Sequence, residues 1–193
     1  MATSEPPARC DAQQRRAILR EAHALGVAAD YGRARGLPIV REPRTLASIG
    51  EDIHSRVQWL VPRAARAFER MRMAAAADAI ELQLVSAFRS AEYQLGILRR
   101  KLERGQSIDE ILRVSAAPGY SEHHSGRAID VSTPGYPPLE ETFEQSPAFA
   151  WLCAQATQFG FALSYPRGNP HRIAYEPWHW CWHPGYRMRA TSS

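Results

Sequence analysis

The chain has 193 residues, 45% of them hydrophobic and 23% charged, which is ordinary for one globular domain. Its net charge of +4 comes from basic residues spread through the chain without a nucleic-acid motif, so we expect no nucleic-acid partner. Charges or prolines interrupt every apolar run well before the roughly 18 residues of a membrane span, and we expect none.

The cysteines and the first residues bear on the compartment. Cys10, Cys153 and Cys181 are widely spaced and fit neither a disulfide framework nor a cysteine-based zinc site. The first 30 residues carry many charges and lack the apolar core of a signal peptide. We therefore expect a reducing compartment, cytoplasmic by default. The alternative is the periplasm or cell envelope, if the native chain starts earlier or is exported by a non-classical route.

Residues 1–60 are expected to form a helical and extended region that packs on the core. Between residues 12 and 35, apolar residues near helical spacing predict one helix followed by a loop, with Gly26 and Gly32 unfavourable to a continuous helix. The Pro- and Gly-containing segment 36–50 predicts extended surface chain, with an edge strand at 37–40 as an alternative. We expect residues 61–187 to form the main domain and residues 188–193 a tail.

The main domain is predicted to begin with a helix and a strand. Pro62 suits a first helical turn, and apolar spacing extends that helix to about Asp78. Alternation over 80–85 predicts a strand. Ser90 can cap a helix that ends near Gly105, and a capping box predicts a short helix over 107–112.

Further strands are expected toward the C-terminus. The patterns predict strands at 128–131, 161–165 and 173–182, and a helix at 146–160. Because helices and strands do not alternate regularly, we expect an α+β fold with a small, mostly antiparallel sheet flanked by helices.

Two segments carry residues typical of a catalytic metal site. His123 is followed by Asp130 seven residues later, and Glu176 by His179 three residues later. Two imidazoles, one carboxylate ligand and one spare carboxylate are the parts of a catalytic zinc site with an open fourth position. We therefore predict a zinc hydrolase.

Spacing alone leaves alternatives for the ligands. His124 competes with His123, although neighbours on an extended segment point to opposite sides and only one could face the metal. His183 would pair with His179 on a helix, but the alternating tryptophans favour a strand. On a strand, Glu176 and His179 would face opposite sides, so a bend near Pro177 is required.

The proposed chemistry also needs a base and a cation. Glu176 is our candidate for the base that takes a proton from water. Arg89, at the end of a predicted strand, is our candidate for a cation beside the reacting carbonyl or the substrate carboxylate. A solvated surface arginine is the simpler alternative for Arg89.

Three ordered motifs resemble the zinc D-alanyl-D-alanine carboxypeptidases and dipeptidases of the VanY and VanX type. They are Ser86-Ala87-Phe88-Arg89-Ser90 with Gln94, the segment from Ser121 to Asp130, and Tyr175-Glu176-Pro177-Trp178-His179-Trp180. The resemblance implies a fold like that of the hedgehog domain and the D-Ala-D-Ala peptidases, with one zinc ion per chain. It implies His123, Asp130 and His179 as ligands, Glu176 as base and Arg89 as the group that assists the transition state.

The resemblance implies a carboxypeptidase that removes a C-terminal D-alanine from peptidoglycan stem peptides. The alternatives are a D-Ala-D-Ala dipeptidase and a zinc-containing binding module without catalysis. We expect Ser121, Tyr175 and Trp178 to contact the substrate. The chain departs from the family pattern at His124, where Gln is common, and at 172–174, where a Thr-Gly pair usually precedes the last motif.

Overall fold

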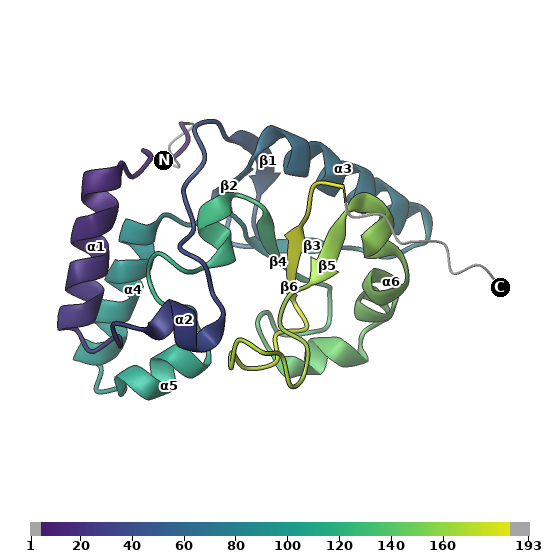
Figure 1. The fold of residues 1–193 in the computed structure, drawn as a ribbon. Coiled ribbons are helices and arrows are strands. Elements are labelled where there is room, and N and C mark those ends of the chain that lie inside the picture. The colour runs from purple at the N-terminus through teal and green to yellow at the C-terminus, as the bar shows by residue number, and fades with distance from the viewer. Residues whose placement is uncertain (1–4, 186–193) are drawn as a thin grey trace.

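The computed structural model describes residues 5–185. Its core is a four-stranded antiparallel sheet with the strand order β3-β4-β6-β5 (Figure 1). A separate antiparallel pair, β1 and β2, lies beside α3. The expected α+β fold with a small antiparallel sheet flanked by helices is therefore confirmed.

The elements follow one another without regular alternation. In chain order they are α1 (Ala12–Ala24), α2 (Tyr31–Arg35), β1 (Ala47–Glu51), β2 (Val57–Leu60), α3 (Pro62–Ala77), β3 (Gln83–Ser86), α4 (Ala91–Glu103), α5 (Ile108–Arg113), the 3-10 turn η1 (Glu122–Ser125), β4 (Ala128–Ser132), η2 (Glu141–Gln145), α6 (Pro147–Gln155), η3 (Ala156–Phe159), β5 (Phe161–Leu163) and β6 (His179–Trp182).

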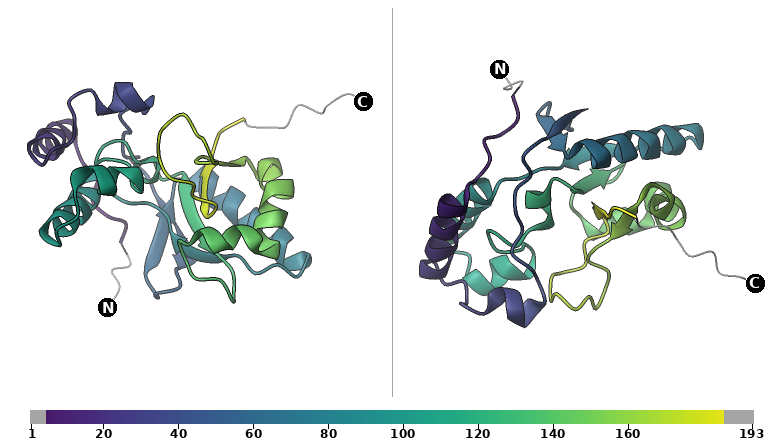
Figure 2. Two further views of the ribbon diagram at one scale, coloured as in Figure 1. Left: turned by 90° about the horizontal axis from the view of Figure 1, so that it is seen from below. Right: turned by 45° about the horizontal axis from the view of Figure 1, so that its top comes forward.

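Two apolar clusters form the core of the molecule. One joins α3, α6 and the sheet around Phe68, Ile129 and Phe161, which are fully buried. The other joins α1, α2, α4 and α5 around Tyr31 and Leu95. Figure 2 shows α1 and α4 together on one side of the molecule and α6 on the other.

The N-terminal region contributes to the second cluster instead of standing apart. The buried carboxylate of Glu42 accepts hydrogen bonds from the backbone amides of Cys10 and Ala91, at 2.8 and 2.7 Å. Glu42 thereby ties the chain before α1 to the start of α4. The domain boundary at residue 60 stays a prediction, and the expected tail at 188–193 lies outside the described residues.

Several helices agree closely with the sequence. The helices α3, α4 and α5 begin where Pro62, Ser90 and Ser107 predict, and the Ser90 and Ser107 side chains accept hydrogen bonds from the amides of the first turn. Strand β4 is also as expected. These elements have strong local signals at their ends.

Other predictions were wrong in their extent. The helix expected after residue 12 is α1, which ends before Gly26 with its φ of +106°, but the loop expected after it contains a second short helix, α2. The strand expected at 80–85 covers Gln83–Ser86, and residues 37–40 form no strand. Of the strand expected at 173–182, only His179–Trp182 is a strand, because Pro177 lies in a turn before it.

No helix among residues 5–185 is both long and apolar enough to cross a membrane.

Candidate metal centre

The sheet register makes two predicted ligands direct neighbours. Asp130 on β4 lies opposite His179, the first residue of β6. His123 comes from the 3-10 turn η1, just before β4, and its ring centroid is 4.9 Å from that of His179. One potential ligand atom from each of these three buried side chains lies within 4.8 Å of the others, so the group could hold a metal ion.

The hydrogen bonds indicate which ring nitrogens are left for a metal. His123 Nδ1 is 2.6 Å from the Ala87 carbonyl oxygen, so this nitrogen carries the proton and donates it. His123 Nε2 then faces Asp130 Oδ2 at 3.2 Å. His179 faces Asp130 Oδ1 through Nδ1 at 3.0 Å. Nε2 of His123, Nδ1 of His179 and the Asp130 carboxylate therefore converge on one point.

His124 is turned away from this group and holds the backbone instead. Its Nδ1 donates to the Arg89 carbonyl oxygen at 2.6 Å, while Nε2 accepts from the Gly119 amide at 3.1 Å. Burial lowers the pKa of this ring to about 3, so it stays neutral. The extended geometry expected for this segment was wrong, because His123 and His124 lie on a 3-10 turn.

Glu176 reaches the metal group through the expected bend. The His179 amide donates to the Glu176 carbonyl oxygen at 3.1 Å across Pro177 and Trp178. This turn brings Glu176 Oε2 to 3.8 Å from His179 Nδ1. Burial raises the pKa of Glu176 to about 7. A carboxyl group of this pKa can accept and return a proton near neutral pH.

Arg89 lies at the same centre and is not a solvated surface residue. One of its guanidinium nitrogens is 3.6 Å from Asp130 Oδ2, and the other donates to Gln94 Oε1 at 3.0 Å. Gln94 in turn donates to Ser115 Oγ and to the Ala116 carbonyl oxygen, at 2.7 and 3.0 Å. This chain of hydrogen bonds fixes the guanidinium against the predicted ligand Asp130.

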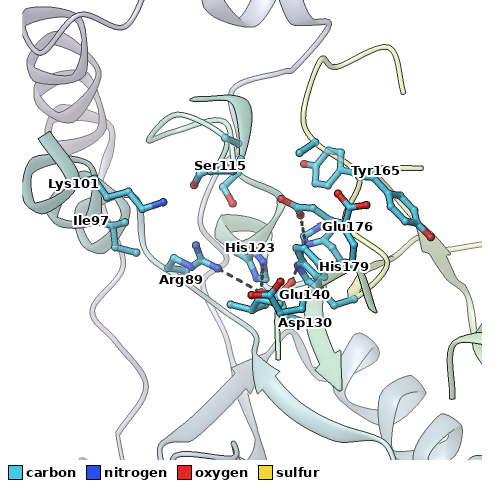
Figure 3. Close-up of a pocket in the computed structure, with 18 residues that line it drawn as sticks. Arg89, Ile97, Lys101, Ser115, His123, Asp130, Glu140, Tyr165, Glu176 and His179 are labelled. Carbon is cyan, nitrogen blue, oxygen red and sulfur yellow. Dashed lines mark hydrogen bonds and ion pairs between the residues drawn. The ribbon is translucent and has the colours of Figure 1, made fainter. Parts of the chain in front are cut away.

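The group opens into a pocket of about 530 Å³. Figure 3 shows Lys101, Ile97 and Arg89 on one side of His123 and Asp130, with Glu176 and Tyr165 on the other. The three residues predicted to contact substrate, Ser121, Tyr175 and Trp178, also line this pocket. Their contacts with a substrate stay a prediction.

Three residues at or beside this centre were not predicted from the sequence. Glu122 hydrogen-bonds to His179, Tyr165 packs its ring 4.8 Å from that of His179, and Lys101 projects into the pocket from α4. Glu122 is adjacent to His123 in sequence, and Lys101 is the one lysine in the chain. Neither signal indicates a role before the fold brings these residues together.

Comparisons with known proteins converge on one family. The family model described as "VanY: D-alanyl-D-alanine carboxypeptidase" matches residues 57–185. Among relatives, YodJ of Bacillus subtilis is 32% identical over 137 residues, which cover 68% of this chain. The match covers 48% of YodJ, so the chain spans about half of that relative.

Solved structures share the fold. The LdcB LD-carboxypeptidase has a TM-score of 0.67 at 29% identity, over 75% of this chain and 71% of that one. A mutant of the D,D-pentapeptidase VanY, solved in complex with Zn(II), has a TM-score of 0.56 at 24% identity. That match covers 72% of this chain and 78% of the other. These likenesses confirm the predicted fold of the D-Ala-D-Ala peptidases.

Proposed function

Since this chain belongs to the VanY family of D-alanyl-D-alanine carboxypeptidases, we propose that it removes a C-terminal D-alanine from peptidoglycan stem peptides in a zinc-dependent reaction. The observation that carries the proposal is the convergence of His123, Asp130 and His179 at the base of a pocket. Glu176, which is not needed as a ligand, lies beside them. The retained Glu176 and Arg89 favour an enzyme over a binding module.

The donor set fits zinc. Two neutral imidazole nitrogens and one carboxylate are the ligands of many catalytic zinc sites, which keep a further position open for water or substrate. All three side chains are buried, so an ion would be held away from bulk solvent on one side and face the pocket on the other. A zinc ion held by His123, Asp130 and His179 would supply Lewis-acid chemistry, which lowers the pKa of water to roughly 7 and polarises a carbonyl group. We propose one ion per chain.

The side chains of the protein would provide proton transfer, charge stabilisation and substrate contacts. Glu176 accepts the proton of the attacking water and returns it to the departing amine of D-alanine. Arg89 directs its guanidinium toward the pocket beside Asp130, where it can stabilise negative charge on the carbonyl oxygen. Ser121, Tyr175 and Trp178 line the walls along which the peptide would lie.

Replacing Arg89 tests this electrostatic role. We expect Arg89→Ala to lower kcat by about 10²-fold or more, the usual effect of losing one donor to a developing oxyanion. Zinc content should be measured in parallel, because Arg89 also contacts Asp130. Arg104→Ala, an exposed residue just after the end of α4, is the matched control. Wild-type turnover by zinc-loaded Arg89→Ala would remove Arg89 from the mechanism.

Lys101 is our candidate for recognition of the free C-terminus. Its side chain extends into the pocket beside Arg89 (Figure 3), and within residues 5–185 its ammonium group forms no ion pair. Ile97 and Val114 line the same part of the pocket and offer apolar contacts to a small side chain. A C-terminal D-alanine combines these features, with a methyl group and a carboxylate.

Replacing the ammonium tests this recognition. We expect Lys101→Met to raise KM for a D-Ala-terminated peptide and to lower kcat/KM roughly 10- to 100-fold, as for the loss of a charged hydrogen bond. The same peptide with a C-terminal amide should be affected much less. Arg100→Met, the neighbouring position on α4, is the control. If Lys101→Met keeps the wild-type preference for the peptide with a free C-terminal carboxylate over the peptide amide, the assignment of Lys101 is contradicted.

A substrate panel tests the proposed function itself. Zinc-loaded protein should release D-alanine from tetrapeptide or pentapeptide stems, and a chelator should abolish the release. Release from the pentapeptide indicates D,D-carboxypeptidase activity, and release from the tetrapeptide indicates L,D-activity. Cleavage of D-Ala-D-Ala alone would identify a dipeptidase. No turnover of any member by zinc-loaded protein would contradict the proposal.

A further inference from the structure

The His179 ring is held by a carboxylate at each of its two nitrogens. Nδ1 is 3.0 Å from Asp130 Oδ1, and Nε2 is 2.9 Å from Glu122 Oε2. The ring is only 2% exposed, so neither nitrogen relies on solvent. An imidazole that binds a metal through one nitrogen can carry a proton only on the other. The two carboxylates therefore play different roles toward His179.

The position of the predicted metal group indicates which nitrogen of His179 would bind the metal and which would carry the proton. His123 Nε2 and Asp130 lie on the Nδ1 side of His179, so the lone pair directed at a metal is that of Nδ1. Nε2 is therefore left to carry the ring proton, and Glu122 is placed to accept a hydrogen bond from this N–H group. A carboxylate that accepts a hydrogen bond from the second N–H group of a ligand histidine fixes the tautomer and the ring orientation and makes the ligand more basic.

We propose that Glu122 is a positioning residue that prepares His179 to bind the metal through Nδ1. Glu122 does not touch the reacting atoms in this role. It acts through its hydrogen bond to His179, while the Tyr165 ring, 4.8 Å away, packs against the imidazole. The inference concerns the metal centre and holds whichever peptide is the substrate.

The local structure explains why this residue adjoins a ligand in sequence. Glu122 and His123 are consecutive residues of the 3-10 turn η1. Gly126, with a φ of +64°, ends this turn. The turn presents His123 toward Asp130 and Glu122 toward β6. One short turn thus supplies one ligand and steadies another that lies 57 residues later. The Ala87 carbonyl oxygen does the equivalent for His123.

A second arrangement competes for the same carboxylate. Glu122, Cys181 and His183 also have potential ligand atoms within 4.8 Å of one another. Cys181 and His183 follow His179 at alternate positions of the chain, at and just beyond the end of β6. An ion bound there would make Glu122 a ligand itself. The hydrogen bond to buried His179 favours the positioning role, because it already occupies one carboxylate oxygen at 2.9 Å.

The test measures zinc affinity by competition with a chelator of known affinity. We expect Glu122→Ala to weaken zinc binding about 10- to 100-fold, the usual effect of removing such a partner of a ligand histidine. Glu122→Gln, which keeps a hydrogen-bond acceptor, should lie between Ala and wild type. Glu141→Gln, a carboxylate at the pocket rim paired with Arg167, is the matched control and should not change the affinity.

A second readout follows the tautomer directly. In zinc-loaded protein labelled with ¹⁵N-histidine, NMR should show His179 with its proton on Nε2 and that signal should weaken or exchange faster in Glu122→Ala. Wild-type zinc affinity in folded Glu122→Ala, or in Glu122→Gln if the Ala variant does not fold, would overturn the inference. So would two zinc ions per chain that fall to one in Cys181→Ser. If Glu122→Ala binds zinc more weakly but neither the wild type nor any variant hydrolyses a peptide, only the proposed function is refuted.

Discussion

Glu176→Gln should retain one zinc ion per chain and lose about 10²- to 10⁴-fold in kcat, the range that a general base contributes. The carboxylate lies 3.8 Å from His179 Nδ1, and burial raises its pKa to about 7. Gln keeps the shape of the side chain and removes its ability to take a proton. Activity should be measured as D-alanine released, with zinc content determined on the same samples.

Another pocket carboxylate provides the control for this experiment. Glu140 lines the same pocket but is exposed, so Glu140→Gln should leave kcat nearly unchanged. If Glu176→Gln turns over at the wild-type rate, Glu176 is not the base. If it loses zinc as well as activity, Glu176 contributes to the metal site directly.

Removing a ligand should have the second large effect. In His123→Ala, we expect the zinc content after dialysis to fall from about one ion per chain to a small fraction, because two protein ligands remain where zinc normally has at least three. Peptide turnover should be lost with the zinc. Zinc can be measured by atomic absorption. His54→Ala, an exposed histidine on the turn between β1 and β2, should keep both zinc and turnover. Full zinc content in His123→Ala would exclude His123 as a ligand.

The metal group could be predicted because its residues lie in short motifs with fixed spacing. Asp130 follows His123 by seven positions, and His179 follows Glu176 by three. The sequence also predicted that the chain must bend near Pro177, and the structure has a turn there. What spacing could not predict is the pairing of Asp130 with His179 across the sheet, since register depends on distant strands.

The missed features depend on contacts between distant segments. Strands β1 and β2 form a hairpin with mostly half-exposed residues, so neither carries a strong apolar pattern. Glu122 gains its partner from β6, far along the chain. Residues 173–178 form loop in place of strand because their amides do not pair with a neighbouring strand. Ala174 donates to the carbonyl oxygen of Arg113, the last residue of α5, and Glu176 donates to that of Tyr165, just after β5.

The most direct measurement of the metal centre is anomalous X-ray scattering at the zinc edge from crystals grown with one equivalent of zinc. We predict one strong peak, within about 2.0–2.2 Å of His123 Nε2, His179 Nδ1 and an Asp130 carboxylate oxygen. A peak instead among Glu122, Cys181 and His183, or no peak at all, would contradict the assignment of this centre.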